Sequence, residues 1–213
     1  MKKTSNAIRI AAALAIATTM STCVVAGTLA KYTTNGSSGD SARVAKWGVT
    51  VASASGSAFA TSYTESGAMQ ASVASSNGDK VIAPGTSGTL PGTTVTGTPE
   101  VAVAVTHTAT VTTTGNWGTD YLPIKVKVGS GDDASYVTGT SASDLTSKIN
   151  TELAKSNKTF IAAGTNLAND GAPSLSWEWA YAGNDDGKDT TAGNQATAPT
   201  ISISVSTTVT QVD

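Results

Sequence analysis

The stretch EVAVAVTHTATVTTT, residues 100–114, decides the fold class, because two kinds of side chain alternate along it almost without a break. One set is mostly apolar, and the other is mostly threonine and alanine. A period of two residues is typical of a β-strand with one face on a core and one toward water. The face expected to point inward carries Val101, Val103, Val105, His107, Ala109 and Val111.

The same alternation recurs in three other segments, and β-branched residues, which favour strands, are abundant throughout. The inward residues expected there are Leu122, Ile124, Val126, Val128, Leu175, Trp177, Trp179, Tyr181, Ile201, Ile203, Val205 and Val209. Near the start of the chain, Trp47, Val49 and Val51 form a shorter set of this kind. Residues 52–80 predict only one or two short strands, and residues 83–100 are rich in turn signals.

One segment breaks the strand pattern. Leu145, Ile149 and Leu153 are spaced four apart, which makes one apolar stripe on a helix. Ser143 can cap that helix, and Asp144 in its first turn suits the helix dipole. The sequence therefore predicts a mostly β protein: a jelly-roll-like antiparallel β-sandwich with one inserted α-helix over about residues 142–156.

The first thirty residues have the composition of a signal peptide, with Lys2, Lys3 and Arg9 ahead of a short apolar run that ends in small residues. The run is short and spotted with polar residues, whereas a membrane span needs about 20 apolar residues. We expect residues 1–30 to form a cleaved signal helix, residues 31–42 a flexible tether or donor strand, and residues 43–213 a single sandwich domain. Cleavage after Gly27, a retained anchor and lipidation at Cys23 are the alternatives.

A chain exported in this way is secreted, to the medium or the cell surface, with a signal peptidase as its partner during export and no membrane attachment after cleavage. Three of its 13 Lys and Arg residues lie in the leader, so the remainder carries 10 against 15 Asp and Glu, a net charge of −5. No basic cluster follows the leader, which argues against nucleic acid as a partner. Cys23 is the only cysteine, which excludes disulfides and thiolate chemistry after cleavage.

No constellation of catalytic residues stands out. His107, the only histidine, lies among valines on the inward face of its strand, and neither a Gly-x-Ser-x-Gly elbow nor a His-Glu-x-x-His zinc motif is present. We therefore expect no catalytic, cofactor-binding or metal-binding residues. Asp185, Asp186 and Asp189 predict a solvated acidic turn, with a weak calcium site as the alternative. The four tryptophans favour core packing over a sugar-binding platform.

A leader ending in GTLAKYTT (residues 27–34), followed by SARVAKWGVTV (41–51), resembles the start of the SipW-dependent TasA/camelysin-like family of secreted surface and biofilm-matrix proteins. The stretches APGTSGTL, TGTPEVAVAV, NWGTDYLPIKVKV, LSWEWAYAGNDDGKDTTAGN and the terminal VTQVD resemble one subgroup of that family. The likeness spans nearly the whole chain.

The resemblance implies a jelly-roll fold, export and, in fibre-forming members, polymerisation by donor-strand exchange. The donor would be residues 31–40, where Tyr32 is the only large apolar side chain; Val44, Trp47 and Val49 are the alternative donor residues. The expected function is a non-catalytic structural subunit of extracellular fibres, a pilus-like polymer or a biofilm matrix, with copies of itself as partners. The alternatives are a camelysin-like secreted metalloprotease and a soluble surface adhesin or carbohydrate-binding module.

Overall fold

The structure is a computed structural model that describes residues 37–64, 72–130, 135–181 and 185–212. The predicted signal peptide and the first residues of the predicted tether, Tyr32 among them, lie outside the described residues. The chain divides into two compact units, Met1–Arg43 and Val44–Asp213. In the first unit, residues 37–43 are exposed and lie outside any helix or strand.

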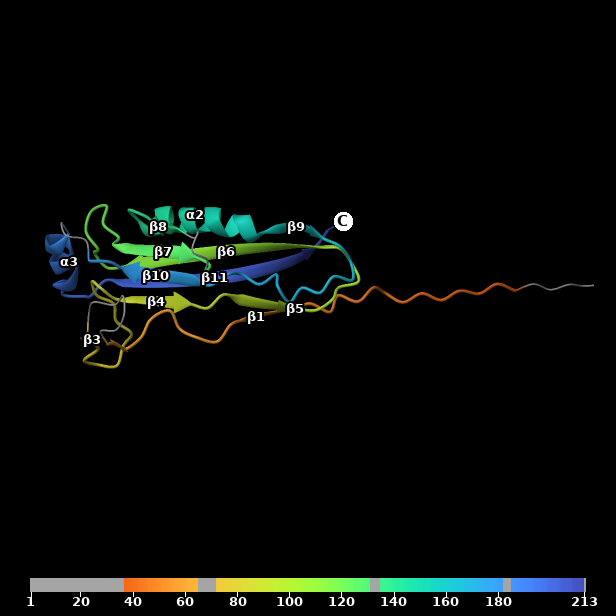
Figure 1. Ribbon diagram of the computed structural model, residues 1–213, viewed down its shortest axis with the longest axis horizontal. Coiled ribbons are helices and arrows are strands. Elements are labelled where there is room, and N and C mark those ends of the chain that lie inside the picture. Colours follow the sequence, from red (N-terminus) through yellow and green to blue (C-terminus); the bar gives the residue numbers. More distant parts are fainter. Residues whose placement is uncertain (1–36, 65–71, 131–134, 182–184, 213) are drawn as a thin grey trace, which may run out of the picture. The chain divides into compact units, whose positions relative to one another are not determined.

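The second unit is built mainly of antiparallel strands (Figure 1). The strands are β1 (Thr50–Ser53), β2 (Ser62–Tyr63), β3 (Val73–Ala74), β4 (Ser87–Leu90), β5 (Thr93–Thr96), β6 (Val103–Thr114), β7 (Ile124–Val128), β8 (Tyr136–Thr138), β9 (Lys158–Ile161), β10 (Leu175–Trp179) and β11 (Thr200–Gln211). The helical elements are α2 (Ala142–Leu153), a 3₁₀ turn (Ala154–Ser156) and α3 (Asp186–Gly193). The two principal sheets have the orders β4-β10-β7-β8 and β11-β6-β9, with small ribbons β1-β5 and β2-β3. The predicted antiparallel β-sandwich is confirmed.

The longest pairing joins β6 to β11. Every residue of β6 has a partner in β11, from Thr114 with Thr200 to Val103 with Gln211. On its inner face β6 is closed: the exposed fractions of its alternate side chains from Val103 to Val111 are all 4% or less. On the outer face, hydroxyls bridge the two strands, as between Thr108 and Ser206 at 2.8 Å. The alternation in the sequence therefore predicted both faces of this strand correctly.

The main core lies between the two sheets and is centred on Trp177, whose exposed fraction is 1%. Its ring packs against Phe59 and Tyr63, with centroids 5.1 and 6.3 Å away, and its Nε1 donates to the carbonyl of Ala58 at 2.7 Å. Gly88 on the paired strand β4 makes room for this ring, since a Cβ there would lie 2.8 Å from Trp177 Nε1. A Cβ at this position would also lie 2.4 Å from the carbonyl oxygen of Ala58, so the packing here requires glycine.

Helix α2 matches its prediction closely. Leu145, Ile149 and Leu153 are fully buried in the main core, and the helix continues into the 3₁₀ turn that ends at Ser156. The cap is Ser141, not Ser143, because it is the Ser141 side chain that accepts from the amide of Asp144. In Figure 1 the helix lies alongside β6, β7 and β8, the strands that it contacts.

A second row of side chains on this helical segment closes the free edge of β6. Strand β9 pairs with β6 only at Val103 and Val105. Beyond that, the amides of His107, Ala109 and Val111 donate to side-chain oxygens of Asn157, Asn150 and Thr146 at 2.8, 2.7 and 2.9 Å. Asn150 Nδ2 also donates back to the carbonyl of Ala109 at 3.1 Å. The helix thus takes the place of a neighbouring strand and leaves no open template for another chain there.

Three sequence expectations about strands differ from the structure. The turn-rich segment contains strands β4 and β5 on either side of Pro91 and Gly92. Trp47, just before β1, and Val51, within it, are expected to face inward but are 41% and 39% exposed, because β1 and β5 form a sheet of only two strands. Tyr181 is 56% exposed, because β10 ends two residues earlier.

The helical closure of β6 predicts a specific loss of stability. Asn150→Ala should lower the free energy of unfolding by about 1–3 kcal/mol, because it leaves the partly buried N–H and C=O of Ala109 without partners. Urea denaturation measures this. Thr151→Ala, on the exposed side of the same helix, is the control and should change stability by less than about 0.5 kcal/mol. Equal effects of the two substitutions would contradict the role given to Asn150.

Candidate functional site

His107 is buried, with an exposed fraction of 3%, and it belongs to a chain of hydroxyls that ties three strands together. Its Nδ1 lies 2.8 Å from Thr207 Oγ1 on β11, which lies 2.5 Å from Thr93 Oγ1 on β5. The amide of Ala172 donates to that second hydroxyl at 2.9 Å. Burial lowers the pKa of His107, and the charge of Asp170 partly opposes that change. This chain of hydrogen bonds links strands β6, β11 and β5, with the His107 imidazole at one end and the Ala172 amide at the other.

The acidic residues predicted to form a turn or a calcium loop lie instead at helix α3. Asp189 turns toward the sandwich, where its Oδ1 accepts from Tyr121 OH and, at 3.2 Å, from Trp179 Nε1. Asp185 pairs with Lys188, its Oδ1 3.8 Å from Nζ. The three aspartates therefore do not converge on one point. Over the part of the chain that the structure describes, no three His, Cys, Asp or Glu residues are placed to hold a metal ion.

The contact between Asp189 and Tyr121 is electrostatically strong. Burial raises the pKa of Tyr121, and the hydrogen bond to Asp189 and the charges of Asp189 and Asp185 raise it further. The phenol therefore stays protonated and donates at every ordinary pH. Lys188 Nζ lies 5.2 Å from the centroid of the same ring. Asp189 thus anchors α3 to the sandwich.

Three of the four tryptophans lie in the core, as predicted. Trp117, Trp177 and Trp179 are 7%, 1% and 5% exposed, and the rings of Trp117 and Trp179 lie 5.7 Å apart. Trp47 differs, at 41% exposed. Its neighbours are nonetheless tied to the body of the protein, because the amide of Lys46 donates to Glu100 Oε2 and the amide of Glu100 donates to the carbonyl of Lys46.

The feature that the sequence did not reveal is the outer edge of β11, the edge that faces away from β6. The amides of His107, Ala109 and Val111 point to the helical segment, so these residues form the pairs that exchange no hydrogen bond with β11. Their partners on β11 must likewise direct their N–H and C=O groups away from β6. Those partners are Thr207, Val205 and Ile203. Among the described residues, no strand pairs with that edge.

Burial across the paired register supports the same view of this edge. On β6 the inward side chains are closed, yet two of the β11 residues directly opposite, Val205 and Val209, are only partly buried. Ile201, at the start of β11, is also partly buried. The layer that covers β6 therefore stops short of β11 at these positions.

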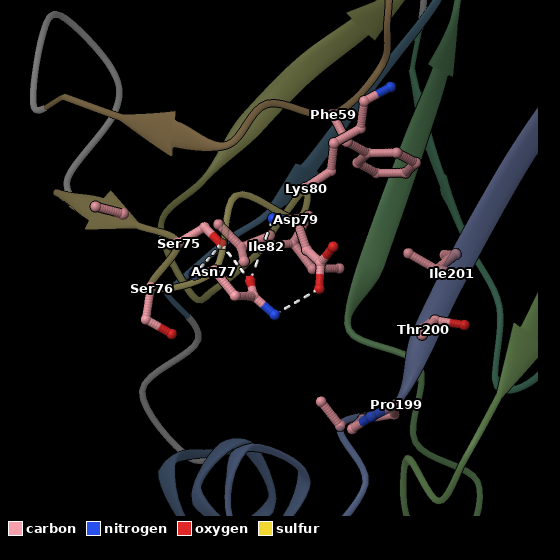
Figure 2. A pocket seen from close by; sticks show the side chains of 13 residues that line it. Phe59, Ser75, Ser76, Asn77, Asp79, Lys80, Ile82, Pro199, Thr200 and Ile201 are labelled. Carbon is pink, nitrogen blue, oxygen red and sulfur yellow. Dashed lines mark hydrogen bonds between the residues drawn. The ribbon is translucent and has the colours of Figure 1, made fainter.

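A groove of about 610 Å³ lies beside the first residues of β11 (Figure 2). Its apolar wall consists of Phe59, Val81, Ile82, Pro199 and Ile201. Its polar rim is the loop from Ser75 to Lys80, in which Asn77 bridges its neighbours: Ser75 Oγ donates to Asn77 Oδ1 at 2.8 Å, and Asn77 Nδ2 donates to Asp79 Oδ2 at 2.7 Å. Figure 2 shows this loop facing the start of β11 across the groove.

Comparisons with known proteins add no relative: no protein-family model, curated protein or solved structure matches this chain. The described helices include none that is both long and apolar enough to cross a membrane. The candidate functional site is therefore defined by geometry alone, as the open edge of β11 with the groove at its start.

The buried histidine predicts a pH dependence of stability. In the unfolded chain His107 titrates near its usual value of 6.5, whereas in the folded protein its pKa is lowered. Between the two values the unfolded chain binds more protons, so this contribution is intact above about pH 6.5 and is lost as the pH falls toward the folded pKa. Urea midpoints at pH 7.5 and 5.5 should show a loss that His107→Gln removes. A variant with the same pH dependence as the parent would contradict this assignment.

The anchoring of α3 gives a second prediction. Asp189→Ala should cost about 1–3 kcal/mol, because the mostly buried Tyr121 OH and Trp179 Nε1 both lose their acceptor. Thermal or urea denaturation measures the loss, and faster amide exchange in α3 should accompany it. Asp186→Ala removes an exposed charge from the first turn of the same helix and should cost less than about 1 kcal/mol. The reverse order of the two effects would show that Asp189 is not the anchor.

Proposed function

We propose that this protein is a secreted, non-catalytic structural subunit that joins copies of itself into extracellular fibres or matrix by adding a strand from one copy to the sheet of another. The open outer edge of β11 carries this proposal. Export is supported by the leader-like composition of residues 1–30.

The chemistry of β11 supports strand addition. Soluble proteins usually protect an exposed edge with charged residues, proline, a bulge or a covering helix. Strand β11 is twelve residues long, TISISVSTTVTQ, and contains no charged residue and no proline. The opposite edge of β6 is covered by β9, Asn150, Asn157 and Thr146. The other edge strand of this sheet, β9, is only four residues long and begins with Lys158, so β11 offers an incoming strand the longer and uncharged edge.

Strand addition also accounts for how the assembly would grow. An incoming strand supplies partners to the N–H and C=O groups of Ile203, Val205 and Thr207, and main-chain hydrogen bonds of this kind give affinity in β-augmentation. Because the donor and the acceptor are different surfaces of the molecule, the contact is heterologous. Repetition of such a contact without closure of a ring gives a filament.

The test removes one outward donor while keeping the fold. Val205→Pro takes away an N–H that does not pair with β6, so it should abolish filaments in electron micrographs and sedimentation of the purified protein. Val205→Thr keeps both the amide and a β-branched side chain, and it should still assemble. Circular dichroism of the two variants checks that both remain folded. Dispersed particles from the parent protein at all concentrations and pH values, or filaments from a folded Val205→Pro variant, would refute the proposal.

A further inference from the structure

We propose that the groove beside the start of β11 is the seat for one particular side chain, Tyr32, supplied by the N-terminal segment of a second copy. This inference rests on the proposed function, since it names the donor segment and the pocket that receives it. The flanking residues of the donor would pair with the first residues of β11.

The groove fits a tyrosine better than a purely apolar side chain. Phe59, Ile82 and Ile201 form an apolar wall against which an aromatic ring can pack. The rim opposite them is polar, with the Asp79 carboxylate and the Asn77 amide as hydrogen-bond partners for a phenol. A buried tyrosine ring usually keeps its hydroxyl hydrogen-bonded, which this combination permits. The volume of about 610 Å³ lies within the usual range of about 300–1,000 Å³ for ligand pockets, enough for a ring and its neighbouring backbone.

The position of the groove links it to the open edge. Two of its lining residues, Thr200 and Ile201, are the first residues of β11, and Ile201 packs only partly buried against the main core. A segment that leaves the groove along β11 meets the outward backbone groups of Ile203 and Val205. An anchor in the groove would therefore fix the register of the added strand, which the uniform Ser and Thr sequence of β11 does not fix by itself.

Two of the three alternative donor residues, Trp47 and Val49, lie in a segment that is already held within its own chain. Val49 packs against the small second core around Val95 and Leu167. Trp47 follows Lys46, whose amide and carbonyl both bond to Glu100 of the same chain. These contacts tie residues 46–49 to their own body. Among residues 31–42, Tyr32 is the only large apolar side chain.

Charge favours the same pairing. Residues 31–43, which precede the segment tied to its own body, carry two basic residues and one acidic residue, a net charge of +1. Residues 44–213 carry 8 basic and 14 acidic residues, a net charge of −6. The N-terminal segment of one copy is therefore attracted to the body of another, whereas two bodies repel each other. That asymmetry opposes the symmetric alternative, in which two β11 edges pair directly.

The test uses the exported chain with Tyr32→Ser, which disables its own donor and should stay monomeric. ¹⁵N-labelled chain of this kind is titrated with an unlabelled peptide of residues 31–42, KYTTNGSSGDSA. We expect chemical-shift changes centred on Phe59, Val81, Ile82, Thr200 and Ile201. The control peptide with Ser in place of Tyr32 should bind at least about tenfold more weakly, because it lacks the buried ring.

Each outcome separates this inference from the proposed function. Three results would show that the groove does not receive Tyr32, even if the parent protein polymerises. They are shift changes at other edges such as β4 or β8, equal binding of the two peptides, and filaments from the Tyr32→Ser chain. A parent protein that forms no filament while the peptide binds the groove through Tyr32 would refute the fibre proposal and keep the seat. Tyr32→Phe in the full chain should retain filaments with modest weakening, because the ring is kept and only the rim hydrogen bond is lost.

Discussion

The twelve-residue pairing between β6 and β11 is the constraint on which the rest of this fold depends. It fixes which side chains of both strands face the core, and it fixes which of their amides point away from each other. On the β6 side those amides reach Asn157, Asn150 and Thr146, and on the β11 side they reach no described strand. One register thus produces both a closed edge and an open one.

Different kinds of contact stabilise the sandwich around Trp177 and around His107. Around Trp177 the contacts are aromatic and apolar, and the fit depends on a missing Cβ at Gly88. Around His107 the contacts are hydroxyls, and they join β6 and β11 of one sheet to β5 of another. Burial of these polar groups costs little free energy because each has a hydrogen-bond partner. No described buried side-chain nitrogen or oxygen is left without one.

Local patterns predicted the parts of the structure that local patterns control. The four-residue spacing of Leu145, Ile149 and Leu153 predicted α2 within a residue or two, and alternation predicted the faces of β6. Helix α3 was missed because its anchor, Asp189, bonds to Tyr121, a residue 68 positions away. Strands β4 and β5 were missed because short strands among turn residues are defined by their partners. Whether β11 ends a sheet is likewise a property of the whole topology, so no stretch of sequence could have indicated the open edge.

The amide side chain of Asn150 has a consequence for the chemical lifetime of this fold. It gives one hydrogen bond to the Ala109 carbonyl and receives one from the Ala109 amide, so it mimics a peptide group. Spontaneous hydrolysis of that amide to a carboxylate would place a negative oxygen against the carbonyl it once bonded. The resulting repulsion would loosen the helix from the strand. Deamidation of one side chain would therefore expose the edge of β6 that the helix now covers, and this edge could then pair with another strand.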